Sequence, residues 1–76
     1  MSALPVISGR QLVKYLTKEK GFYVHHQTGS HLILKSRDEQ RTLSVPQHDE
    51  LRKGTLMAIL EQAGITRDQF VREWRK

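Results

Sequence analysis

The sequence predicts a small α+β domain with the order α-β-β-β-α and a short helix at its C-terminus, similar in outline to a double-stranded-RNA-binding domain. Two observations predict this class. Residues 22–45 alternate hydrophobic and polar side chains, as a three-stranded antiparallel sheet does, and segments with helical 3.6-residue spacing flank them. A chain of 76 residues has room for one domain, residues 1–76, and the economical packing places the helices on one face of the sheet.

The first helix is predicted to begin after Ser8 and to end at Gly21. Ser8 and Gln11 have the spacing of a capping box, in which each side chain accepts a hydrogen bond from the other residue's backbone. The hydrophobic positions that follow lie on one helical face: Leu12, Tyr15 and Leu16. Gly21 can adopt the left-handed conformation that ends a helix.

Three strands are predicted at residues 22–27, 30–35 and 41–45, joined by a turn at Thr28–Gly29 and a polar turn at 36–40. Leu32 and Leu34 alternate with His31, Ile33 and Lys35. We therefore expect His31 and Lys35 on the face away from the leucines. Pro46 is expected to end the third strand, because it has no N–H to donate.

Two helices are predicted in the last third of the chain. The first has a hydrophobic stripe of Leu56, Ile59, Leu60 and Ala63, and Gly64 is its stop signal. The second is short, about residues 67–75, and begins after Thr66, which has capping-box spacing to Gln69. Its hydrophobic residues are Phe70, Val71 and Trp74.

Composition and charge exclude several kinds of functional site and indicate a class of partner. No cysteine is present, which excludes disulfides, thiolate metal sites and a cysteine nucleophile. No apolar run approaches 18 residues and the N-terminus lacks a signal-peptide layout, so we expect a cytoplasmic protein without membrane contact. The net charge is +5, and residues 1–37 carry all of it. This asymmetry favours a polyanionic partner, above all nucleic acid, although solubility alone is the simpler explanation.

The four histidines have three candidate uses, of which metal binding is the first. Adjacent strand residues point to opposite faces, so His25 and His26 are not expected to share a metal. The sequence contains no HExxH motif. We therefore expect no metal site and no cofactor.

Catalysis is the second use. His31 follows Gly29 and Ser30 at the start of a strand, and a glycine there lets a phosphate approach the backbone closely. A neutral imidazole can deprotonate the 2′-hydroxyl of RNA, and a cation such as Lys35 can stabilise the charge that develops on the phosphate. The alternative is an ordinary surface histidine in a hairpin.

Binding without catalysis is the third use. Arg10, Lys14 and Lys18 are spaced i, i+4, i+8 and form a basic stripe roughly opposite the hydrophobic face of the first helix. RNA phosphates could lie along this stripe. The alternative is a solvated helix face. A non-catalytic RNA-binding module of the same fold therefore remains open beside an enzyme.

Several motifs, in their order and spacing, resemble the HicA toxin family over about residues 8–66. They are Gly29-Ser30-His31, Val45-Pro46-Gln47-His48, Leu51, Gly54-Thr55-Leu56, Ile59-Leu60 and Ala63-Gly64-Ile65. The resemblance implies a fold similar to the double-stranded-RNA-binding domain. It also implies a metal-independent endoribonuclease that cleaves mRNA and blocks translation, with His31 as the catalytic histidine. This chain departs from the family at His25 and His26, and in a longer tail that ends in Arg72, Trp74, Arg75 and Lys76.

The resemblance leaves the proton donor to the leaving group open. On chemistry alone Lys35 or His48 could serve, and a site without a dedicated acid would be slow. The resemblance also implies a HicB-like antitoxin. We expect it to cover His31, because residues 1–37 carry the positive charge that attracts an acidic surface. The free toxin is expected to be a monomer, and a hetero-oligomer with its antitoxin.

Overall fold

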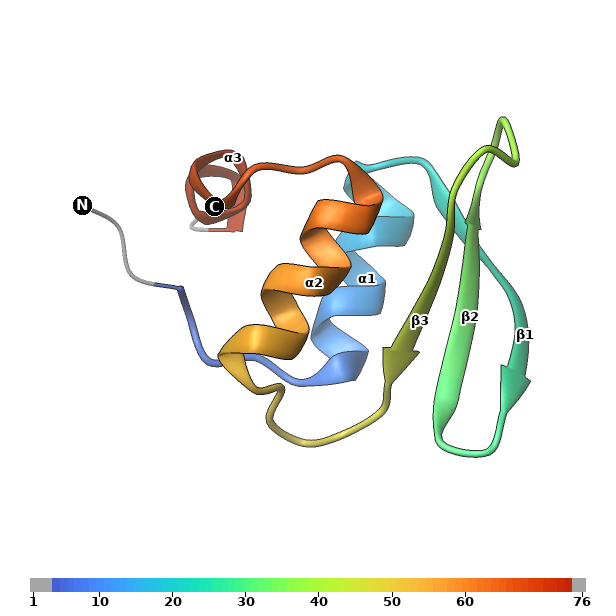
Figure 1. The fold of residues 1–76 in the computed structure, drawn as a ribbon, viewed down its shortest axis with the longest axis horizontal. Coiled ribbons are helices and arrows are strands. Elements are labelled where there is room, and N and C mark those ends of the chain that lie inside the picture. Colours follow the sequence, from blue (N-terminus) through green and yellow to red (C-terminus); the bar gives the residue numbers. More distant parts are fainter. Residues whose placement is uncertain (1–3, 75–76) are drawn as a thin grey trace.

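The computed structural model describes residues 4–74. Their helices and strands are α1 (Gly9–Glu19), β1 (Phe22–Thr28), β2 (His31–Ser36), β3 (Thr42–Pro46), α2 (Lys53–Ala63) and α3 (Arg67–Trp74). The strands form one antiparallel sheet in the order β1-β2-β3, and the helices lie together on one side of it (Figure 1). The predicted α+β class and element order are confirmed. The last residue of the predicted third helix, and the tail residues Arg75 and Lys76, lie outside the described residues.

The start of α1 follows the predicted capping box. The Ser8 hydroxyl accepts the Gln11 backbone N–H at 3.0 Å, and the Gln11 side-chain oxygen accepts the Ser8 N–H at 2.9 Å. Each partner satisfies a backbone donor that the first helical turn would otherwise leave unpaired. The predicted hydrophobic face of α1 is buried.

Pro46 ends β3 as predicted, but it is itself the last residue of the strand, one residue beyond the predicted end. Pro46 lies opposite His31 in the ladder. The next pair is hydrogen-bonded, because the Gln47 N–H donates to the Ser30 carbonyl at 2.7 Å. Pairs in an antiparallel ladder alternate between hydrogen-bonded and non-hydrogen-bonded, so Pro46 occupies a position that needs no N–H.

The hydrophobic core lies between the sheet and the helices. Leu34, Leu43 and Val45 of the strands are fully buried against the helices. The predicted stripe of α2 is buried as well, and Gly64 ends this helix in the left-handed conformation with φ 77°. None of the helices within residues 4–74 is long and apolar enough to cross a bilayer.

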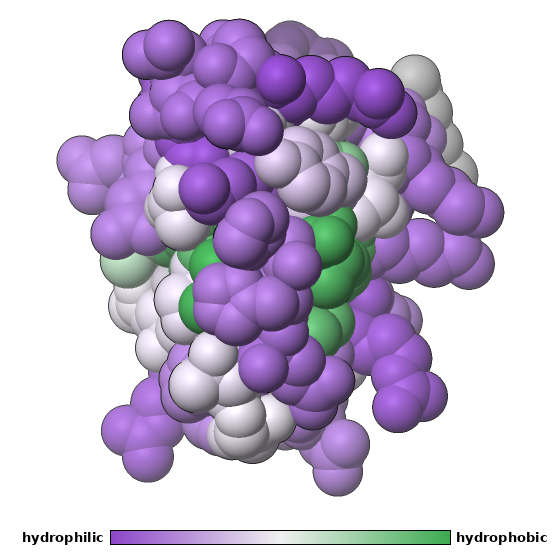
Figure 2. Space-filling view, turned by 90° about the vertical axis from the view of Figure 1, so that its right-hand side faces the viewer, coloured by the Kyte–Doolittle hydropathy of each residue, from purple (hydrophilic) through white to green (hydrophobic). Residues whose placement is uncertain are grey.

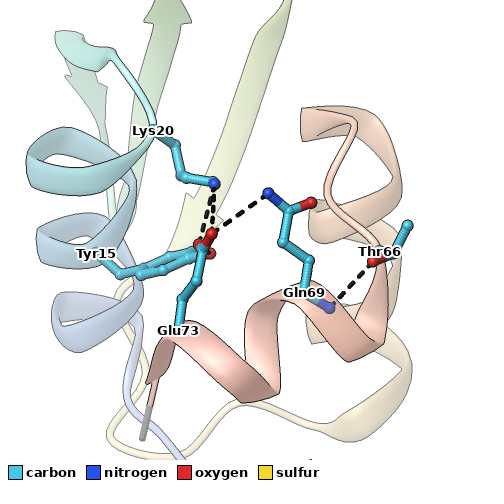
Figure 3. A network of polar contacts seen from close by, with 5 residues as sticks. All are labelled: Tyr15, Lys20, Thr66, Gln69 and Glu73. Atoms are coloured by element: carbon cyan, nitrogen blue, oxygen red, sulfur yellow. Dashed lines mark hydrogen bonds and ion pairs between the residues drawn. The ribbon is translucent and has the colours of Figure 1, made fainter. Parts of the chain in front are cut away.

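Helix α3 is held against α1 by a polar network around Glu73 (Figure 3). The Tyr15 hydroxyl donates to the Glu73 carboxylate at 2.6 Å, and the Lys20 ammonium forms an ion pair with it at 2.9 Å. The Gln69 side chain adds a longer contact of 3.4 Å. The hydrogen bond from Tyr15, followed by that from Lys20, lowers the pKa of Glu73 to about 2. Burial and the same carboxylate raise the pKa of Tyr15.

An aromatic cluster packs beneath this network. The rings of Tyr15 and Phe70 meet edge to face with centroids 5.0 Å apart, and Phe70 and Trp74 stack at 5.6 Å. Phe70 is completely buried. Such aromatic pairs contribute beyond their buried area. Helix α3 is therefore an integral part of the core.

Candidate active site

His31 is the first residue of β2 and is exposed. The turn before it consists of Gly29 and Ser30, and Gly29 has φ 59°, a conformation that favours glycine. The side chains of Leu32 and Leu34 face the core, where Leu34 is fully buried. By strand alternation His31 and Lys35 share the open face of the sheet, as predicted.

The open face is largely polar. Seen from the sheet side of the molecule, hydrophilic side chains cover most of the surface, and small hydrophobic areas show between them (Figure 2). The half-buried Ile33 is the hydrophobic residue of β2 that alternation places on this face, between His31 and Lys35. Within residues 4–74, no helix covers this face (Figure 1). A substrate or a partner protein can therefore reach His31 directly.

Lys35 does not lie beside His31. It is four residues further along β2, opposite Tyr23 of β1 and Thr42 of β3. At about 3.3 Å per strand residue, the two Cα atoms are roughly 13 Å apart. This separation suits contacts with different phosphates of one RNA strand better than a shared role at one phosphate.

Three segments that are distant in the sequence meet at the end of the sheet that carries His31. The Gln47 N–H donates to Ser30, and the Gly9 N–H donates to the His48 carbonyl at 2.9 Å. A Cβ built on Gly9 would lie 1.9 Å from the Pro46 carbonyl oxygen, so only glycine allows this approach. The contact places the first turn of α1 against the loop that follows β3.

A small hollow of about 140 Å³ lies at this junction. It is lined by Ser8, Arg10, Gln47, His48 and Asp49. Arg10 and His48 are both exposed. Of the predicted basic stripe, Arg10 is thus the residue that lies at the end of the sheet occupied by His31.

Lys14 and Lys18 lie elsewhere, although both are exposed as predicted. They line a groove of about 440 Å³ between α1 and α3, together with Tyr15, Glu73 and Trp74. This groove belongs to the helical layer, whereas His31 lies on the open face of the sheet. The structure therefore divides the basic stripe between two places.

His25 and His26 lie on the same side of β1, contrary to the expectation that adjacent strand residues point to opposite faces. The register shifts between Val24 and His26, which marks a β-bulge at His25. A bulge interrupts alternation because two residues oppose one on the neighbouring strand. The two Nδ1 atoms are 2.7 Å apart, so one ring donates to the other. Within residues 4–74, no group of three or more metal-ligating side chains is placed to hold an ion.

The sequence predicted no role at the site for two of its residues, Gly9 and Gln47. The signal for Gly9 was present: a glycine in the first turn of a predicted helix weakens that helix and often marks a close backbone approach. Gln47 gave no such signal, because its contribution to the site is a backbone N–H, which any residue but proline offers.

The fold and the site define a small basic α+β protein with an exposed histidine that follows a glycine–serine turn. A family model described as HicA toxin of bacterial toxin-antitoxin matches residues 9–65. The match covers most of the chain, and the chain therefore belongs to the HicA toxin family: it is the toxin of a toxin–antitoxin pair. No curated protein and no solved structure matches it. Helix α3 lies beyond the matched residues.

Proposed function

We propose that the chain is an endoribonuclease that cleaves mRNA in the cytoplasm without a metal ion and so blocks translation. The observation that carries the proposal is the exposed imidazole of His31. It follows a turn that the hydrogen bond from the Gln47 N–H to the Ser30 carbonyl holds in place. Family membership supports it, because the family is one of toxins. The positive charge of residues 1–37 gives the surface the sign that an RNA substrate needs.

The proposed reaction is attack of a ribose 2′-oxygen on its own 3′-phosphate. Neutral His31 accepts the 2′-hydroxyl proton while the 2′-oxygen bonds to phosphorus. The bond from phosphorus to the 5′-oxygen of the next nucleotide breaks, and that oxygen takes a proton. The products are a 2′,3′-cyclic phosphate and a 5′-hydroxyl. The backbone at Gly29 and Ser30 lets the phosphate approach closely.

Among residues 4–74, no dedicated donor of a proton to the leaving group lies beside His31. Lys35 is roughly 13 Å along the strand. Within residues 4–74, the His31 side chain forms no hydrogen bond or ion pair with His48 or any other residue. We assign Lys35 and His48 to auxiliary contacts with the substrate, and water to the final protonation. An enzyme of this design is slow.

The test is cleavage of a long RNA by purified protein in EDTA, with His31→Ala as the variant. Loss of one acid–base group lowers the rate by about 10²- to 10⁴-fold. His25→Ala is the matched control, because it removes another exposed histidine from the same sheet. If His31→Ala folds and cleaves as fast as the parent, the catalytic assignment is wrong. Binding of RNA without cleavage by the parent would make the chain an RNA-binding module.

We also propose that a HicB-like antitoxin inhibits the toxin by covering the open face of the sheet at His31. No helix of residues 4–74 covers that face, and Ile33 offers an apolar contact between His31 and Lys35. The association rate should fall as salt rises, because opposite charges speed the encounter. Diethyl pyrocarbonate should modify His31 in the free toxin but not in the complex. Equal modification in both would contradict occlusion.

A further inference from the structure

The hollow at the junction of α1 and the loop after β3 has side-chain donors that take no part in the proton transfers of the proposed reaction. Arg10 and His48 line it, and both are exposed. Within residues 4–74, neither side chain forms a hydrogen bond or an ion pair with the protein. Guanidinium and imidazole groups are donors that bind phosphate oxygens.

The backbone of the first turn of α1 is already engaged. The Gln11 N–H donates to the Ser8 hydroxyl, and the Gly9 N–H donates to the His48 carbonyl. A ligand in the hollow must therefore be held by side chains. Asp49 also lines the hollow, and its negatively charged carboxylate repels an anion bound there. Arg10 is not neutralised by it, because no ion pair joins the two within 4.0 Å.

The hollow is joined to the candidate active site through the end of β3. Pro46 lies opposite His31 in the sheet, and Gln47 is tied to Ser30 by a hydrogen bond of 2.7 Å. Two residues of extended chain span at most about 7 Å, so His48 is within that distance of Pro46, measured between Cα atoms. An RNA strand with one phosphate at His31 can reach the hollow with a neighbouring phosphate.

We propose that Arg10 and His48 form a subsite for an RNA phosphate beside the one that is cleaved. The RNA backbone then runs from His31 toward the start of α1, and not along Lys14 and Lys18. This inference rests on the proposed endoribonuclease function and adds the course of its substrate. Gly9 acts as a positioning residue, because its close contact with Pro46 brings Arg10 and His48 to the same hollow.

Helix α1 provides a matched control for this subsite. Arg10 and Lys18 are both exposed cations of one helix, but Lys18 lies in the groove beside Trp74. Either can be replaced by glutamine with the same change of charge and little effect on the core. Circular dichroism spectra of both variants should match that of the parent.

The experiment measures binding of a fluorescein-labelled RNA oligonucleotide to the full chain at several salt concentrations. Every ribose carries a 2′-O-methyl group, so the RNA lacks the attacking hydroxyl and stays intact. Arg10→Gln should weaken binding severalfold and reduce the slope of log affinity against log salt by about 0.7, the value for one phosphate contact of a single strand. Lys18→Gln should leave the slope unchanged, and Asp49→Asn should tighten binding.

Contact by His48 is tested by nuclear magnetic resonance. Its ring signals should shift when the RNA is added to the parent protein, and His48→Gln should weaken binding. If Arg10→Gln leaves the slope unchanged, or Lys18→Gln lowers it equally, the subsite is refuted. Cleavage of unmodified RNA is measured separately with His31→Ala. Loss of cleavage there, with no effect of Arg10→Gln on binding, would refute the subsite while supporting the endoribonuclease.

Discussion

Replacement of Gly9 by alanine tests whether the contact that builds the site also stabilises the fold. A Cβ at this position would lie 1.9 Å from the Pro46 carbonyl oxygen and 2.9 Å from its carbonyl carbon. Both are backbone atoms, so no side-chain rotation relieves the clash. Because real Cβ atoms essentially never approach within 3.0 Å, α1 and the end of β3 must separate by about 1 Å.

The expected cost follows from three contributions. Overpacking a close contact costs about 1–3 kcal/mol. The hydrogen bond from Gly9 to His48, 2.9 Å long, is strained or lost, at about 0.5–1.5 kcal/mol. The better helix propensity of alanine returns at most about 1 kcal/mol. The net loss is about 2 kcal/mol in the free energy of unfolding, which lowers the Tm of a domain of this size by roughly 8–16 °C.

The assay is thermal and urea unfolding of the full chain, followed by circular dichroism. Gly54→Ala is the matched control, because Gly54 also lies in the first turn of a helix and its added Cβ would meet nothing within 4 Å. This control should be as stable as the parent or slightly more stable. If Gly9→Ala unfolds at the temperature of the parent, the contact with Pro46 does not constrain the fold, and the reasoning fails.

Two further predictions concern α3. The pKa of Glu73 is lowered from 4.5 to about 2, so its stabilising contacts with Tyr15 and Lys20 are present above about pH 4.5 and are lost as the pH falls toward 2. Acid titration of the fluorescence of Trp74, the single tryptophan, should show this step, and its persistence in Glu73→Gln would contradict the assignment. Phe70 is completely buried, and Phe70→Ala should cost about 3–5 kcal/mol. The total stability is on the order of 4–11 kcal/mol, so this loss is a large part of it, and the variant should unfold at a clearly lower temperature than the parent by circular dichroism. A transition like that of the parent would show that α3 is not part of the core.

The sequence by itself determined the helices and strands and the face on which His31 lies. Capping boxes, stop residues and strand alternation act over two to four residues, so their signals are local and readable. Ser8 with Gln11 marked the start of α1, and Leu32 with Leu34 oriented β2. The family motifs are also local, because each spans only a few neighbouring residues. The sequence alone therefore indicated the HicA toxin family, which the match to residues 9–65 confirms.

Only the tertiary structure decided which of these residues meet. The even spacing of the basic stripe gave no sign that Arg10 lies beside His48 while Lys18 lies beside Trp74. Nor did the adjacency of His25 and His26 reveal the bulge that turns both to one side. Both arrangements depend on how a helix or a strand packs against segments far along the chain. The close approach of Gly9 to Pro46 is a property of two elements together, and neither encodes it alone.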